Sequence, residues 1–174
     1  MNRVTLILCS SAVLFTSRAG PASTRVQAVR FKQNPIISPR MGHGIGDSIG
    51  NPSLIKVPTW VRHRLGRYYL YFSGHRGTAI RLAYPDHLEG PWSIYEPGAL
   101  SVNDTVCVNY ITAPDVHVDD ERREIRLYFN GPLLDPQRAP RMRQPSLVAI
   151  SKDGIHFNAS SEIRRSLFPR LPFR

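Results

Sequence analysis

The sequence predicts an all-β fold, as part of a β-propeller made of two four-stranded antiparallel blades. Short runs rich in aromatic and β-branched residues alternate with turns that contain Pro and Gly, and almost no stretch has helical periodicity. The pattern of four runs also occurs twice. Pro52 matches Pro114 at an offset of 62, and Tyr71-Phe72 matches Tyr128-Phe129 at 57. Unequal offsets indicate matched strands joined by loops of different lengths.

Residues 1–28 have the layout of a secretory signal segment. A basic start at Arg3 precedes an apolar stretch from Val4 to Phe15, and Val26 and Ala28 occupy the small-residue positions before the predicted cleavage site. Because this stretch is too short to cross a bilayer, we expect a secreted or periplasmic protein with no membrane partner. The alternative interpretation is an apolar N-terminus that is frayed.

The first predicted blade spans about 51–96, within a propeller portion at 29–157. Its strand-like runs are separated by turn sequences such as SGHRGT and PDHLEGP, which favours an antiparallel meander. The four runs are SLIKV (53–57), RYYLYFS (67–73), AIRLAY (79–84) and WSIY (92–95).

The second predicted blade spans about 113–157 and repeats the arrangement. Asp153-Gly154 is the predicted turn of the hairpin that closes this blade, and residues 158–174 read as an irregular basic tail. The four runs are DVHVD (115–119), EIRLYFN (124–130), SLVAIS (146–151) and IHF (155–157).

Two blades do not complete a ring, because propellers close with about four to eight. We therefore expect a partial propeller, either cut short or completed by another copy. Open blade edges expose unpaired backbone groups and apolar faces, and this predicts self-association. A β-sandwich is the competing all-β interpretation, because it also consists of short, evenly spaced strands.

The net charge of +10 is concentrated at the two ends of the chain. Residues 1–28 carry +3 and residues 138–174 carry +6, whereas residues 29–137 contain twelve bases and eleven acids. A nucleic-acid-binding domain places its basic residues along one folded face. We therefore expect no nucleic-acid partner; the remaining alternative is binding through the arginine-rich tail.

The sequence contains no signature of a cofactor or metal site. Cys9 lies inside the predicted signal segment, so Cys107 remains alone and no intramolecular disulfide can form in the mature chain. Phosphate-cradling loops, Cys/His metal spacings and serine-elbow motifs are missing from the sequence. We expect no cofactor and no metal.

A meander places the start of its first strand and the loop after its second strand on one face of the disc. This geometry gathers polar residues from both predicted blades. They are Asn51, Ser73, His75 and Arg76 from the first blade, and Tyr110, Thr112, Asp115 and Asn130 from the second. Because the first strand of a blade is innermost, Asn51 and Asp115 are expected to face the central channel. His117 alternates with Asp115 and shares its face.

Three phrases carry a family resemblance: NPIISP (34–39), the strand head APDV, and the hairpin LAYPDHLEGPW. Together with YYLYFS they resemble glycoside hydrolase family 43 and its five-bladed propeller relatives. The resemblance covers about 34–157. It implies a carbohydrate substrate and hydrolysis of glycosidic bonds, usually in plant-type polysaccharides, by carboxylates around the channel.

Within this resemblance, Asp115 matches an acid that tunes the proton donor, since a neighbouring negative charge raises the donor's pKa. The family's general base is an aspartate before proline, and this position is Asn51, whose amide takes no proton at neutral pH. Asp47 is the candidate replacement, provided that its glycine-rich loop reaches the channel. The donor glutamate would lie on a third blade.

Each candidate also has a structural interpretation. Asp115 can accept backbone hydrogen bonds at a strand end, and Asp47 can form a turn. His75 and Arg76 can be solvated loop residues, and His117 can be a satisfied histidine. Two function classes therefore stay open: a glycosidase, and a non-catalytic carbohydrate-binding or assembly protein.

Overall fold

The computed structural model describes residues 27–42, 45–133 and 144–159. The chain divides into two compact units, Met1–Arg30 and Phe31–Arg174. Of the first unit only residues 27–30 are described; they are exposed and without regular secondary structure. The predicted signal up to residue 26 and the predicted tail beyond residue 159 lie outside the described residues. No helix in the described part is long and apolar enough to cross a membrane.

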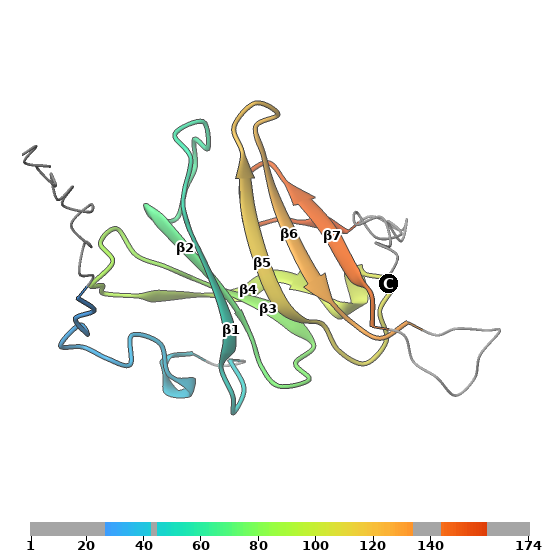
Figure 1. Ribbon diagram of the computed structural model, residues 1–174, viewed down its shortest axis with the longest axis horizontal. Coiled ribbons are helices and arrows are strands. Elements are labelled where there is room, and N and C mark those ends of the chain that lie inside the picture. The colour runs from blue at the N-terminus through green and yellow to red at the C-terminus, as the bar shows by residue number, and fades with distance from the viewer. Residues whose placement is uncertain (1–26, 43–44, 134–143, 160–174) are drawn as a thin grey trace, which may run out of the picture. The chain divides into compact units, whose positions relative to one another are not determined.

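Blade one is a four-stranded antiparallel sheet with the strand order β1-β2-β3-β4 (Figure 1). A single-turn 3-10 helix at Pro39–Met41 precedes it and another at Val102–Asp104 follows it. Because neighbours in sequence are neighbours in the sheet, the predicted meander is confirmed. Its strands are β1 Gly50–Lys56, β2 Tyr68–Ser73, β3 Ala79–Tyr84 and β4 Ser93–Ser101.

Blade two repeats this arrangement with the order β5-β6-β7-β8. Its innermost strand β5 lies beside β1, as the centre of Figure 1 shows, and the two sheets remain separate. The all-β fold with two four-stranded blades is thus confirmed. The strands are β5 Thr112–Asp119, β6 Glu124–Asn130, β7 Ser146–Ser151 and β8 Asn158–Ala159.

The last strand of blade two was predicted wrongly. The segment 155–157 is not a strand, and the two-residue strand β8 follows it at Asn158–Ala159, paired with β7. The predicted irregular tail at 158–174 is therefore also wrong at its first two residues. The cause is the carboxylate of Asp153, whose Oδ1 accepts the backbone N–H groups of Ile155 and His156 at 2.8 and 2.9 Å. Because these donors are used in the turn, sheet pairing begins only after it.

Each blade has the same irregularity at the start of its innermost strand. Pairing of β1 with β2 shifts register between Gly50 and Ser53, and pairing of β5 with β6 shifts between Thr112 and Asp115. Asn51 and Ala113 have φ values of 52° and 54°, and each precedes a proline. The sequence repeat at Pro52 and Pro114 is therefore a repeated bulge-like kink in the inner strand.

The two blades share one apolar core. Tyr71 on β2 is fully buried, its ring is edge-on to Phe157 at 5.9 Å, and its hydroxyl donates to the carbonyl of Gly154 at 2.7 Å. Gly154 has φ +76°, and a Cβ there would lie 2.9 Å from the Tyr71 hydroxyl, so glycine is required. Alternating residues of β6 bury their side chains in the same core: Ile125, Leu127 and Phe129.

The face of each blade that points away from the shared core has a different character. On blade one it is apolar: Phe72 and Ala83 pack against Ile45 of the segment that precedes β1. On blade two it is polar, because Asp115, His117 and Asp119 alternate with residues that face the core. Part of blade one's outer face is therefore covered by three residues that precede β1: Ile37, Ile45 and Ile49.

Candidate functional site

The starts of the two inner strands are joined by a cluster of small polar side chains. The Oγ atoms of Ser73 and Thr112 lie 3.0 Å apart, and Nδ2 of Asn51 donates to Oγ1 of Thr112 at 3.5 Å. Farther along, the backbone N–H of Val116 donates to Oγ of Ser53 at 2.9 Å. These bonds cross from blade one to blade two and set Asn51 next to the start of β5.

Asp115 and His117 project from β5 as an exposed pair. Oδ2 of Asp115 lies 2.9 Å from Nε2 of His117, and the side chains are 68% and 59% exposed. The imidazole is edge-on to the ring of Tyr128, with centroids 5.7 Å apart. The carboxylate of Asp115 is thus oriented by a neighbour and still open to a ligand.

Two further predicted site residues are partly buried near this place. Asn130 ends β6, where it pairs with Thr112 on one side and Ser146 on the other. The hydroxyl of Tyr110 accepts a hydrogen bond from the side-chain amide of Gln144. Both residues therefore have structural partners at the same end of blade two.

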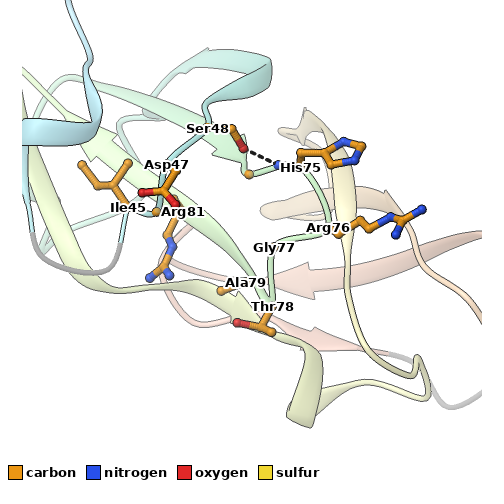
Figure 2. Close-up of a pocket in the computed structure, with 11 residues that line it drawn as sticks. Ile45, Asp47, Ser48, His75, Arg76, Gly77, Thr78, Ala79 and Arg81 are labelled. Atoms are coloured by element: carbon orange, nitrogen blue, oxygen red, sulfur yellow. Dashed lines mark hydrogen bonds between the residues drawn. The ribbon is translucent and has the colours of Figure 1, made fainter.

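A second group of candidates lines a pocket of about 280 Å³, which we call the β2–β3 pocket (Figure 2). It lies between the segment at 45–48 and the loop that joins β2 to β3. Figure 2 shows Asp47 and Arg81 on one side, with His75 and Arg76 on the opposite side. The polar side chains of its wall are Asp47, Ser48, His75, Arg76, Thr78 and Arg81.

The pocket groups the sequence candidates in a way that the sequence did not predict. Asp47 lies with His75 and Arg76, whereas Asn51 and Asp115 are not part of the pocket wall. Ser48 holds the loop in place, because its Oγ accepts the backbone N–H of His75 at 2.7 Å. Asp47 is thus placed against the third strand of blade one.

Sequence reasoning missed Arg81 as a pocket residue. The signal for it was the alternation in β3, where Ile80 and Leu82 face the shared core and Arg81 therefore faces the opposite side. The local sequence pattern did not show that the segment at 45–48 lies over the side of β3 that carries Arg81.

The loop between β2 and β3 also connects the two groups. The carbonyl of Gly77 accepts the backbone N–H of Ile111 at 3.1 Å, just before β5 begins. At the other end of the loop, Ser73 bonds to Thr112. The pocket and the Asp115–His117 pair therefore lie on either side of one loop that is anchored to both blades.

A second pocket, of about 290 Å³, lies at the hairpin between β7 and β8. Burial acts to raise the pKa of Asp153 there, but hydrogen bonds from His156, Ile155 and Ser151 outweigh it and hold the pKa at about 2. Because its oxygens already accept these bonds, Asp153 fixes the turn. Among the described residues, no group of His, Cys, Asp or Glu side chains is arranged to hold a metal ion.

No model of a protein family matches the chain. The uncharacterized protein R118 of Acanthamoeba polyphaga mimivirus is 35% identical over 154 residues, which cover 75% of this chain and 41% of that protein. The chain thus spans well under half the length of this relative.

Two solved structures to which the chain is similar are enzymes of glycoside hydrolase family 43. A GH43_1 enzyme from Xanthomonas citri has a TM-score of 0.51 at 18% identity, over 67% of this chain and 33% of the enzyme. CoXyl43, a β-xylosidase/α-arabinofuranosidase from a compost microbial metagenome, has a TM-score of 0.50 at 17% identity, over 67% of this chain and 35% of the enzyme. At such identities the likeness concerns the fold: the described chain has the fold of adjacent blades of a glycoside hydrolase family 43 propeller.

Proposed function

We propose that the protein acts on plant-type poly- or oligosaccharides as part of a family 43-like propeller, with Asp115 as an acid at the channel. The observation that carries this proposal is the exposed Asp115–His117 pair on the inner strand of blade two, next to the start of β1. One of the similar enzymes was solved with xylotriose, which supports a carbohydrate as the ligand class.

The chemistry of hydrolysis needs more than one carboxylate. An inverting glycosidase uses an acid and a base, roughly 6.5–9.5 Å apart, with a water between the base and the sugar. Asn51 cannot act as the base, because its amide takes no proton at neutral pH. Asp115 can therefore tune the pKa of the proton donor or position the sugar, and both the proton donor and the base have to come from outside the two described blades.

The test is hydrolysis and binding of arabinoxylan-type oligosaccharides by the full chain and by Asp115→Asn. We expect the variant to lose the release of reducing sugar while keeping the fold measured by circular dichroism. Glu121→Gln, in the turn at the far end of β5, is the matched control and should behave like the wild type. Turnover that is unchanged in Asp115→Asn would remove Asp115 from the reaction.

A second candidate function is non-catalytic glycan binding or assembly. The observation that favours it is Asn51, which stands where the family has its base and donates to Thr112. This function predicts saturable binding of glycan by calorimetry without any release of reducing sugar. The absence of heat with every glycan tested would contradict both functions.

Two further proposals concern where the protein acts and with what. From residues 1–28 we propose export; the N-terminal sequence of protein recovered from the periplasm or medium should begin at Val29.

We also propose association of two copies through the outer face of blade one, where Leu54 is 48% exposed. Sedimentation should then show a dimer that Leu54→Lys converts to monomer; a wild-type monomer would contradict this.

A further inference from the structure

We propose that the β2–β3 pocket binds the carboxylate of an acidic sugar, which makes the ligand a uronic-acid-bearing glycan. This inference rests on the proposed function, since it names the class of carbohydrate that the site takes. It also gives a role to His75, Arg76 and Arg81, which the chemistry at Asp115 does not use.

The charge of the pocket wall is the first step. The pocket wall contains two arginines, Arg76 and Arg81, but one carboxylate, Asp47, so one positive charge remains in excess even with His75 neutral. The surrounding propeller portion is close to neutral, with twelve bases and eleven acids at 29–137. The excess is therefore a local feature of this pocket.

The second step is that these guanidinium groups are available. Within the described ranges, neither Arg76 nor Arg81 has a carboxylate within salt-bridge distance. On blade two, by contrast, Arg122 and Arg126 bind Asp119 at 3.0 and 2.8 Å. A planar guanidinium without a partner matches an incoming carboxylate with two parallel hydrogen bonds.

The size and the remaining wall fit one sugar ring. The volume of about 280 Å³ lies at the lower end of the roughly 300–1,000 Å³ typical of ligand pockets, so it suits a monosaccharide unit better than a longer segment. Ser48 and Thr78 line the wall and add hydroxyl groups, which can bond to sugar hydroxyls. Asp47 can accept such hydroxyls on the side of Arg81 shown in Figure 2.

The loop that forms one wall of the pocket also contacts the start of β5, the strand that carries Asp115. The loop that forms one wall is anchored to Thr112 through Ser73 and to Ile111 through Gly77. A glycan chain bound near Asp115 therefore lies on one side of the loop that carries His75 and Arg76, and the β2–β3 pocket lies on the other side of that loop. An acidic side residue of that chain is the part that the pocket would take.

The experiment is calorimetric titration of the full chain with a xylo-oligosaccharide bearing glucuronic acid and with the same oligosaccharide lacking it. We expect the acidic ligand to bind about tenfold more tightly, because a hydrogen bond to a charged group is worth more than one tenfold step in affinity. Arg81→Gln should reduce its affinity to that of the neutral ligand. Added salt should weaken only the acidic ligand.

Two variants separate binding from folding. Arg76 has φ 54° in a turn closed by Gly77 N–H and Gly74 C=O at 3.2 Å, so Arg76→Gly relieves backbone strain while removing the guanidinium. We expect this variant to be at least as stable as the wild type and still to lose preference for the acidic ligand. Arg62→Gln, at an exposed arginine outside the pocket wall, should keep that preference.

The outcomes distinguish this inference from the function on which it rests. Equal affinity for both oligosaccharides would overturn the acidic-sugar subsite and leave the proposed function standing. Binding of neither would overturn both. An acidic preference that survives in Arg81→Gln and Arg76→Gly, or that inorganic phosphate abolishes at the concentration of the sugar, would show unspecific anion binding and overturn the subsite.

Discussion

Replacing Tyr71 by Phe tests whether the two blades are held by one specific buried bond. Tyr71 is fully buried, and its hydroxyl donates across the blade interface to Gly154 at 2.7 Å. The change removes one oxygen and leaves the buried carbonyl of Gly154 without this donor. The ring contact with Phe157 remains, so the effect isolates the hydrogen bond.

The expected loss follows from the burial of the carbonyl. An acceptor left without its partner in the interior costs about 1–3 kcal/mol, whereas a typical net hydrogen bond is worth about 0.5–1.5 kcal/mol. Tyr69→Phe is the matched control, because the Tyr69 hydroxyl accepts the backbone N–H of Leu65 at 2.9 Å within blade one and in a partly buried place. We expect Tyr71→Phe to lose more free energy of unfolding than Tyr69→Phe.

The assay is urea unfolding followed by circular dichroism, with the midpoint and the slope fitted for both variants. Because the blades share one core, a single transition is expected, and Tyr71→Phe should lower its midpoint without changing its slope. A loss for Tyr71→Phe that is smaller than that for Tyr69→Phe would refute the reasoning. Two separate transitions in the wild type would refute the shared core.

Further predictions concern two other polar contacts of blade two, one made by Asp153 and one made by Asp120. Asp153 has a folded pKa of about 2 against an ordinary value of 3.8, so its contribution to stability is present above pH 4 and is lost as the pH falls toward 2. With the side chain 41% exposed, we discount that contribution to about 1 kcal/mol. Unfolding midpoints at pH 5 and pH 2 should therefore differ less for Asp153→Asn than for the wild type, and parallel curves would contradict this. Trp60 Nε1 donates to Asp120 Oδ1 at 2.8 Å, across the blades but in an exposed place, so Trp60→Tyr should cost less than Tyr71→Phe. A Trp60→Tyr loss above that of Tyr71→Phe would place the main link between the blades at the surface.

Strand positions were predictable wherever alternation alone decides them. The runs at 79–84, 124–130 and 146–151 are strands with the predicted bounds, because each alternates between the shared core and the opposite face. The predicted run at 92–95 instead extends to Ser101. Gly98 takes φ +76° within β4, and the pairing of β3 with β4 shifts register there, so the strand continues through Pro97-Gly98.

The candidate site was predictable where it depends on the repeat. Matching Pro52 to Pro114 was enough to place Asn51 near the start of β5, since both mark the same kink in the inner strand. The place of Asp47 depends instead on how the segment at 45–48 folds over β3, which no local pattern determines. The grouping of Asp47 with Arg81 was therefore beyond sequence reasoning.

The outer face of blade two explains why Asp115 differs from the other acids on this face, Asp119 of β5 and Glu124 of β6. The pKa of Asp119 is lowered most by the hydrogen bond that its carboxylate accepts from the backbone N–H of Arg122. The guanidinium groups of Arg122 and Arg126 lower this pKa further. Glu124 lies 3.5 Å from both Arg126 and Lys152. At the inner end of the strand, the ion-pair partner of Asp115 within the described residues is His117, which is charged only when protonated. Asp119 and Glu124 are thus paired with arginine and lysine side chains, whereas Asp115 is paired with an imidazole and is exposed, and it is this carboxylate to which the proposed function assigns a role.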